Sequence, residues 1–295
     1  MSTRWPPAGT VPLAIDVVSI QSQVVYGRVG NNVALPTLQA FGLTTAAVPT
    51  VTLSNTPHYA SLHGGATPID WFGGWLDDLV QRGALKRLKA VLCGYLGSVA
   101  QADALADWLD ARAALQAGVG IVIDPVIGDH DYGVYVDPGL VDAYRQKLLP
   151  LAIGATPNDF ELAQLTGREV TDTASAVAAA RTILAGRLQW IAVTSTPHAQ
   201  GGKETMQVTL VMRRDAWAIT HPKIDACPKG TGDLFSAALT GHWLTGQEPP
   251  QAAASACAHV LQALRLTQEA HCAELLLPAQ TPLETAKEVS IEALT

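Results

Sequence analysis

The sequence has few of the features that mark secreted, membrane-spanning or nucleic-acid-binding proteins. Its 295 residues include four cysteines with no CxxC pair, which is typical of reduced thiols in a cytoplasm. The formal net charge of −7 disfavours nucleic acid and acidic membrane surfaces as partners. No stretch approaches the ~18 uncharged apolar residues of a membrane helix. We therefore predict a soluble, cytoplasmic protein.

Three common motifs of nucleotide and acyl chemistry are also missing. The chain has no GxxxxGK followed by Ser or Thr, no GxGxxG in its first strand-to-helix turn, and no GxSxG. The first absence excludes a P-loop site in its usual form, and the second argues against a dinucleotide site. The third excludes the nucleophile elbow of an α/β-hydrolase.

Short apolar runs alternate along the chain with segments of helical periodicity. The runs, rich in β-branched residues, are 15–20, 46–53, 90–92, 120–126 and 191–195. The helical segments are 70–80, 100–115, 140–149, 160–166 and 174–184. This alternation predicts an α/β fold: a doubly wound, mostly parallel central sheet with helices on both faces.

The pattern changes in the last third of the chain. Over 205–220 it predicts a small antiparallel hairpin, with strands 205–211 and 217–220. Two further helical segments, at about 232–244 and 250–267, follow the hairpin. We expect a flexible leader over 1–12, a single domain over 13–278 and a frayed polar tail over 279–295.

The stretch 229–235 carries the strongest indication of chemistry. Gly230 and Gly232 flank Thr231, Asp233 follows, and an apolar helical pattern begins at once. Glycines permit positive φ, and the N–H groups at a helix N-terminus have no intrahelical partner. The stretch therefore predicts an anion site, with Asp233 able to take a proton from an attacking hydroxyl. The alternative is an ordinary helix start capped by Asp233.

Polar residues also follow four predicted strands, in the segments 21–27, 53–59, 123–129 and 156–161. Ligands bind at the carboxyl ends of parallel strands. The first segment could be a simple turn, His58 a surface residue, and Asn158 with Glu161 a helix capping pair. Asp124 ends a very apolar strand, where a charge is costly without a cation. Together with the glycine stretch, the four segments favour phosphoryl transfer by positioning, anion stabilisation and a base.

The same segments resemble those of pyridoxal kinases in the ribokinase superfamily, and most closely the bacterial pyridoxine/pyridoxal/pyridoxamine kinase type. The resemblance extends from residue 15 to 278 and rests on 19–27, 54–59, 94–97, 124–129, 156–161 and 229–235. It implies a ribokinase-like fold and transfer of a phosphoryl group from ATP to the 5′-hydroxymethyl group of a B6 vitamer. The product would be pyridoxal 5′-phosphate or one of its relatives.

The resemblance also implies roles for individual residues. Asp233 would be the base, and the N–H groups of Gly230, Thr231 and Gly232 would stabilise the transferring phosphoryl group. The substrate-binding residues would be Ser22, Val29, His58, Tyr95 and Asp233. The ATP-binding residues would be Asp124, Thr156, Glu161, Thr194, Ser195, Thr220, His221, Lys229 and Gly230.

Metal ions and a mobile flap belong to the same set of implications. Glu161, Asp124 and Thr156 would organise Mg²⁺, with K⁺ or Na⁺ near the nucleotide phosphates. The flap over those phosphates would be 129–135, with Asp129 and Tyr135 at its ends and Gly133 as hinge. Members of the family are commonly homodimers, which we carry over as an expectation.

Two other functions stay open at this point. Hydroxymethylpyrimidine, from the thiamine pathway, also offers a hydroxymethyl group on a flat nitrogen ring. A regulatory protein of the same fold could bind pyridoxal phosphate without turnover, although Asp233 and Glu161 would then have no use. Cys227 lies close enough to the glycine stretch for oxidation to affect activity, unless it is buried.

Overall fold

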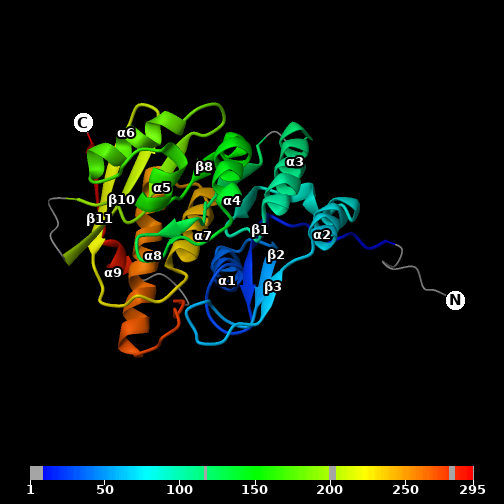
Figure 1. The fold of residues 1–295 in the computed structure, drawn as a ribbon, viewed down its shortest axis with the longest axis horizontal. Helices are drawn as coiled ribbons and strands as arrows, with labels where there is room; N and C mark the ends of the chain where they lie inside the picture. Colours follow the sequence, from blue (N-terminus) through cyan, green and yellow to red (C-terminus); the bar gives the residue numbers. More distant parts are fainter. Residues whose placement is uncertain (1–8, 116–117, 199–203, 279–282, 295) are drawn as a thin grey trace.

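A sheet of ten strands runs through the centre of the protein in the computed structural model (Figure 1), which describes residues 9–115, 118–198, 204–278 and 283–294. The strand order is β12-β11-β10-β9-β8-β5-β4-β1-β2-β3. The six strands from β9 to β2 are parallel, and the flanking strands are antiparallel. Their bounds are β1 Val17–Val24, β2 Thr45–Leu53, β3 Gly64–Ala66, β4 Ala90–Cys93, β5 Gly120–Ile123, β8 Gly154–Ala155, β9 Trp190–Val193, β10 Thr205–Met212, β11 Ala216–Pro222 and β12 Ser290–Leu294.

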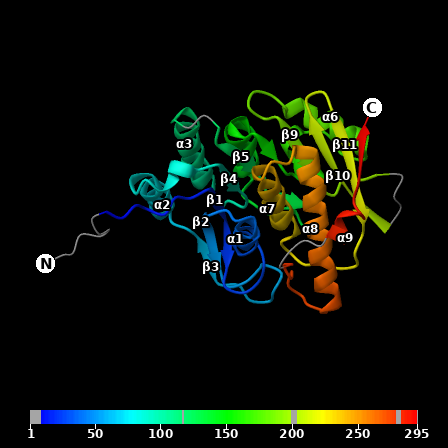
Figure 2. The ribbon, with the colours of Figure 1, turned by 180° about the vertical axis from the view of Figure 1, so that it is seen from behind.

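Helices cover both faces of the sheet. Side chains alternate along β1, so Val18 and Ile20 pack with α2 to α6, whereas Val17 packs with α1, α7 and α8. Figure 1 looks onto the first layer and Figure 2 onto the second. The bounds are α1 Asn31–Ala40, α2 Ile69–Gln81, α3 Val99–Leu115, α4 Pro138–Ala143, α5 Asp159–Thr166, α6 Thr173–Ile183, α7 Thr231–Leu244, α8 Pro249–Glu269 and α9 Leu283–Ala286.

The predicted fold class is confirmed. The sheet is mostly parallel, helices lie on both of its faces, and β10 pairs with β11 in the hairpin expected over 205–220. The helix expected over 140–149 is instead α4, which passes into a π-helical turn at Tyr144–Leu148 and a short 3₁₀ turn at Leu149–Leu151. Pro150 lies in that last turn, where its missing N–H is tolerated.

Several elements were not predicted from sequence, α1 and β8 among them. α1 begins directly after Gly30 and contains Pro36, a residue that argues against a helix in any pattern-based reading. β8 has two residues, Gly154 and Ala155, which is too short for a periodic signal. It is held between β5 and β9, so its strand conformation comes from its neighbours.

The expectation of a frayed C-terminal tail is wrong for residues 290–294. They form β12, an antiparallel edge strand on β11, with Ile291 opposite Ile219 and Ala293 opposite Trp217. Backbone hydrogen bonds to an existing edge can order a segment whose side chains are mostly exposed. Of the predicted leader, residues 1–8 lie outside the described part, and residues 9–12 are exposed and belong to no element.

None of the described helices is both long and apolar enough to cross a membrane.

Candidate active site

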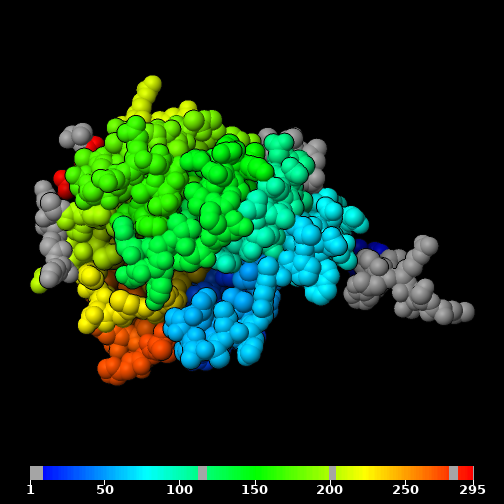
Figure 3. Space-filling view, in the orientation of Figure 1, coloured from blue at the N-terminus to red at the C-terminus, as the bar shows by residue number. Residues whose placement is uncertain are grey.

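A cavity of about 450 Å³ opens at the carboxyl ends of β1, β2 and β4, next to the start of α7. In the space-filling view, segments from the first, middle and last thirds of the chain meet in the lower half of this face (Figure 3). The predicted site residues that line the cavity are Ser22, Val29, His58, Tyr95, Asp129, Tyr135, Lys229, Gly230 and Asp233. The fold therefore brings together residues that are more than two hundred positions apart in the sequence, such as Ser22 and Asp233.

The start of α7 requires glycine for two reasons. Gly230 has φ 98°, which side-chain-bearing residues rarely adopt, and an added Cβ would collide with the carbonyl oxygen of Arg28. Gly230 is the residue before the helix, and within the described chain no side chain caps this helix. Asp233 lies in the first turn and is not the cap, so the alternative of an ordinary capped helix start is not realised. The first-turn N–H groups are available for an anion.

The Asp233 carboxyl group has an altered acidity. Burial raises its pKa to about 6, and a hydrogen bond from the backbone of Gly30 opposes that shift. A carboxylate with this pKa is ionised near neutral pH and is a better proton acceptor than an exposed aspartate. Gly30 itself is confined, since an added Cβ would meet the carbonyl and hydroxyl oxygens of Ser22.

Two further carboxylates lie behind Asp233. Asp124, after β5, accepts a hydrogen bond from Ser236 Oγ at 2.8 Å, and Thr156 Oγ1 lies 2.8 Å from the same Oγ. Burial and then the charge of Asp233 raise the pKa of Asp124; burial and then Asp124 raise the pKa of Glu161. In the described part of the chain, none of the three carboxylates has a Lys, Arg or His within ion-pair distance. Such a cluster favours a cation from solution.

Glu161 is held in place by backbone donors. Its Oε1 accepts from the N–H of Ile127 at 2.9 Å, and its Oε2 from the N–H of Asn158 at 2.8 Å. Asn158 Oδ1 accepts in return from the Glu161 N–H at 2.7 Å, so the capping pair noted in the sequence is formed. Each carboxylate oxygen keeps lone-pair capacity beyond these bonds. Glu161 can therefore take part in the capping pair and still accept hydrogen bonds from the water shell of a metal ion.

The residues predicted to organise Mg²⁺ fit a hydrated ion better than a directly bound one. Among the described residues, no three His, Cys, Asp or Glu side chains are grouped closely enough to hold a metal. Asp124, Thr156 and Glu161 nevertheless supply oxygen atoms and uncompensated negative charge. Mg²⁺ usually keeps several of its waters and takes few direct protein ligands.

The predicted flap is a small hairpin. β6 (Gly128–Asp129) pairs with β7 (Gly133–Val134), and Asp129 Oδ1 accepts from the N–H of Tyr132 at 2.8 Å to close the turn. Gly133 has φ 68°, as a hinge position would allow. Two contacts hold the hairpin down. His130 Nε2 lies 2.8 Å from Asp159 Oδ2, and Lys229 Nζ lies 4.8 Å from the ring centre of Tyr132.

The opposite wall of the cavity carries the predicted vitamer-binding residues. His58 Nδ1 lies 2.9 Å from Thr56 Oγ1 in the loop after β2. Tyr95 follows β4, and its carbonyl accepts from Thr50 Oγ1 at 2.6 Å. Burial raises the pKa of the Tyr95 phenol, so the ring is a neutral, partly apolar surface. These side chains could contact both the face and the polar edge of a flat ring.

Seven of the nine predicted nucleotide-binding residues do not line this cavity: Asp124, Thr156 and Glu161, described above, and Thr194, Ser195, Thr220 and His221. Thr194 bridges to Asn158 in parallel fashion at the end of β9, and Ser195 follows with φ 56°. Thr220 and His221 lie in β11, where His221 is buried with Nδ1 2.9 Å from the carbonyl oxygen of Pro222. These last four residues lie on the strands beyond β8, on the Glu161 side of the sheet.

Sequence reasoning missed several residues of the site. Ser236 joins Asp124 to Thr156, and helical spacing from Asp233 could have indicated it. Tyr132 lines the cavity between two predicted flap residues. The other unpredicted lining residues carry no sequence signal of their own, because they are mostly apolar: Val24, Val51, Leu53, Thr56, Pro57 and Val126.

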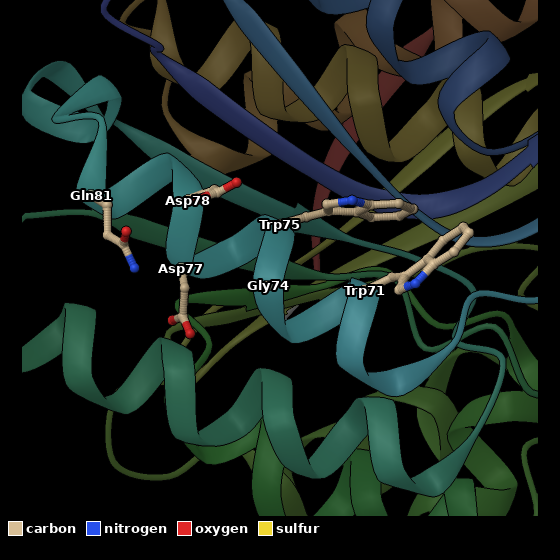
Figure 4. Close-up of a pocket in the computed structure, with 6 residues that line it drawn as sticks. All are labelled: Trp71, Gly74, Trp75, Asp77, Asp78 and Gln81. Atoms are coloured by element: carbon tan, nitrogen blue, oxygen red, sulfur yellow. The ribbon is translucent and has the colours of Figure 1, made fainter.

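A second hollow lies on α2, away from the strand ends. It is open and shallow, and Figure 4 shows Trp71, Trp75 and Asp77 among the side chains along the helix. It offers two carboxylates, Asp77 and Asp78, with no glycine turn or helix N-terminus directed at it. We therefore take the cavity at the strand ends as the candidate active site.

The fold is ribokinase-like. A glycine-lined helix N-terminus lies beside a carboxylate, under a hairpin at the carboxyl edge of the sheet, an arrangement that suits phosphoryl transfer to an alcohol. Residues 30–275 match the model of the family described as phosphomethylpyrimidine kinase, and the chain belongs to this family. A pyridoxine/pyridoxal/pyridoxamine kinase from Bordetella bronchiseptica is 55% identical over 271 residues, 92% of this chain and 96% of that protein.

Solved structures agree with this assignment. Pyridoxal kinase from Entamoeba histolytica has a TM-score of 0.87 at 23% identity, covering 96% of this chain and 100% of its own, which shows the shared fold. Pyridoxal kinase from Leishmania donovani in complex with ADP and pyridoxamine has a TM-score of 0.82 at 25% identity, with coverages of 95% and 99%.

Proposed function

We propose that the protein transfers a phosphoryl group from ATP to the 5′-hydroxymethyl group of pyridoxal, pyridoxine and pyridoxamine. The observation that carries this proposal is one cavity that Ser22, His58 and Tyr95 line together with Asp233 and Gly230. The Bordetella bronchiseptica pyridoxine/pyridoxal/pyridoxamine kinase is 55% identical across nearly the whole chain, which supports B6 vitamers as the substrates.

In this proposal the ring lies between Tyr95 and Val29, with Ser22 and His58 hydrogen-bonded to its polar edge. The hydroxymethyl group then faces Asp233, which accepts the hydroxyl proton as the oxygen attacks the γ-phosphorus atom. The N–H groups of Gly230, Thr231 and Gly232 stabilise the negative charge on the transferring group. ADP leaves with the electron pair of the broken P–O bond.

The nucleotide lies along the other strand ends. We propose that Asp124, Thr156, Glu161, Thr194, Ser195, Thr220, His221 and Lys229 form its site. Asp124, Thr156 and Glu161 would hold hydrated Mg²⁺, and a K⁺ or Na⁺ ion could offset the same cluster. When bound, Mg²⁺ neutralises phosphate charge. The hairpin with Asp129, Gly133 and Tyr135 excludes water from the phosphates.

Hydroxymethylpyrimidine is the second candidate substrate, because the matching family model is described as phosphomethylpyrimidine kinase. Both substrates place a hydroxymethyl group on a flat ring, so the same base and anion site serve either one. A binding protein without turnover is disfavoured, because such a protein has no use for a carboxylate in the first turn of a helix whose N-terminus forms an anion site.

The test is a coupled ADP-release assay with Mg-ATP against the three vitamers and hydroxymethylpyrimidine, side by side. Turnover of a vitamer that is lost in Asp233→Asn supports the proposal. Turnover of hydroxymethylpyrimidine alone would identify that compound as the substrate and contradict the vitamer kinase. Tight vitamer binding with no turnover of any substrate contradicts both kinase functions.

We further propose that the enzyme is a cytoplasmic homodimer. Its described cysteines are all free thiols, which supports a reducing compartment. α2 exposes the two tryptophans of Figure 4, Trp71 and Trp75, a face that a second copy could cover. Light scattering of Trp71→Ser gives the test. A dimer that becomes a monomer supports this surface, and a monomeric wild type contradicts the homodimer.

A further inference from the structure

The loop between β2 and β3, residues 54–63, contributes one wall of the cavity and is tied at two places. At its base, the Ser54 N–H donates to the His63 carbonyl at 2.7 Å, and the His63 N–H donates to Ser54 Oγ at 2.9 Å. At its tip, the Tyr59 hydroxyl donates a hydrogen bond to the Glu274 carboxylate. The base is thus held by the loop itself and by the Tyr26 N–H, which donates to the Ser54 carbonyl at 2.9 Å. The tip is held by a residue far along the chain.

Glu274 comes from the segment after α8 and reaches two other parts of the chain. Its side chain is buried, with 8% of the residue exposed, and its hydrogen bond to Tyr59 raises the pKa of that phenol to about 12. A Cβ added to Gly27 would lie 2.9 Å from Glu274 Oε2, so the turn after β1 packs directly on the carboxylate. No described Lys, Arg or His lies within ion-pair distance of it. A buried carboxylate in this setting depends on its hydroxyl partner.

Tyr59, whose hydroxyl is held by Glu274, contacts a residue that lines the cavity. Its ring centre lies 4.3 Å from that of His58 with the planes 33° apart, a tilted stack, and 6.0 Å from that of Tyr26, edge to face. His58 is exposed and lines the cavity, and its side chain also hydrogen-bonds to Thr56. The stacked Tyr59 ring therefore limits the orientations of the imidazole.

We propose that Tyr59 and Glu274 form a positioning pair, which sets the orientation of His58 toward the ring of the substrate and so determines affinity for the vitamer. The inference rests on the proposed vitamer site. Tyr59 and Glu274 act through His58, so their loss widens the range of imidazole orientations and lowers the fraction of enzyme ready to bind. The ATP side of the site lies on other strands and is not affected.

Kinetics of single variants give the first test. Tyr59→Phe keeps the stacked ring and removes the hydroxyl, and Glu274→Ala removes the acceptor of the same hydrogen bond. Each should raise KM for pyridoxal about three- to tenfold, the factor that a loss of about 0.7–1.4 kcal/mol produces. KM for ATP should stay unchanged. Glu274→Gln keeps an acceptor oxygen and should restore most of the affinity.

A double-mutant cycle separates positioning from a general structural effect. In a His58→Ala background, Tyr59→Phe should have no further effect on KM for pyridoxal, because the residue it positions is gone. Glu288→Gln is the matched control, since Glu288 pairs with Arg265 on the surface through two hydrogen bonds of 2.6 Å. An effect of Tyr59→Phe that persists in His58→Ala, or equal changes in both KM values, would overturn the proposal.

A readout without substrate keeps this inference separate from the proposed function. Hydrogen–deuterium exchange over residues 54–63 should be faster in Tyr59→Phe than in the wild type, whatever the substrate is. Unchanged exchange together with unchanged KM contradicts the positioning pair. Absence of vitamer turnover in the wild type contradicts the proposed function instead, with the exchange result still decisive for the pair.

Discussion

Asp16 and Asp124 are buried carboxylates at opposite ends of the central sheet, and their partners differ in charge. At the amino end of β1, Asp16 is 1% exposed and has Arg87 and Lys89 at 3.2 Å and the Thr44 N–H at 2.9 Å. Burial alone would raise its pKa, but the Thr44 hydrogen bond and then the two cations outweigh burial, so the pKa is lowered. At the carboxyl end, Asp124 has hydroxyl partners and, among the described residues, no cation within ion-pair distance, and its pKa is raised.

The difference shows which buried charges stabilise the fold and which are kept for chemistry. A carboxylate that is paired with cations of the protein contributes to stability, and its negative charge is already neutralised before any ligand binds. A cluster of carboxylates without cations costs stability until a metal or substrate arrives. Asp16 thus stabilises the fold at the amino end of the sheet, whereas the carboxylates at the carboxyl end are suited to binding a ligand and to proton transfer.

The largest expected effect comes from neutralising the reactive end. Asp233→Asn should lower kcat by about 10²–10⁴, the usual contribution of a general base. Its melting temperature should be equal to or higher than that of the wild type, because one uncompensated buried charge is gone. The ADP-release assay and a thermal melt on one preparation measure both. Retained turnover would show that Asp233 is not the base.

The pH dependence of activity should report the ionisation of Asp233. Asp233 must be ionised to accept a proton, so kcat/KM should fall about tenfold per pH unit below an apparent pKa near 6. Above that pH the profile should be flat until another group titrates. A pH–rate profile at saturating ATP gives the measurement, with Asp233→Asn as control. A profile that stays level from pH 7 to pH 4.5 would contradict the assignment.

At the amino end, the effect should be on stability and not on turnover. Asp16→Asn should lower the free energy of unfolding by about 1.5–3 kcal/mol, the range for hydrogen bonds to a charged group. The pKa of Asp16 is lowered in the folded state, so its contribution is complete above about 3.9 and is lost as pH falls through the folded value. Urea titrations at pH 7 and at low pH measure this. A reduced kcat in the folded variant would remove the contrast between the two ends.

The smallest effect concerns a thiol near the reactive end. Cys227 is exposed, so burial does not protect it, whereas Cys257 is buried in α8. Alkylation of the wild type should lower kcat/KM several-fold, and Cys227→Ser should be resistant. Mass spectrometry identifies the modified residue. Unchanged activity after complete alkylation of Cys227 would exclude redox sensitivity at this position.

Local patterns predicted much of the fold and the centre of the site. Near-continuous apolar runs identified the parallel strands, and the order Gly230, Thr231, Gly232, Asp233 indicated an anion site at a helix start. Strand β12 escaped prediction because its order comes from the edge of β11 and not from its own side chains. Ser236 also escaped, because the role of a single hydroxyl depends on neighbours that only the fold brings together. Tyr132 lay within the predicted flap 129–135, but its contact with Lys229 was not predicted.

The sequence by itself determined the class of fold, the glycine turn with its acid, and the family to which these residues belong. These features depend on short-range order along the chain: hydrophobic period, positive φ at glycine and the first turn of a helix. The tertiary structure decided which carboxylates have cations and which do not, and which loop residues stack or hydrogen-bond across the cavity. Those outcomes depend on groups such as Tyr59 and Glu274, which are brought together across the fold and cannot be read from position in the chain.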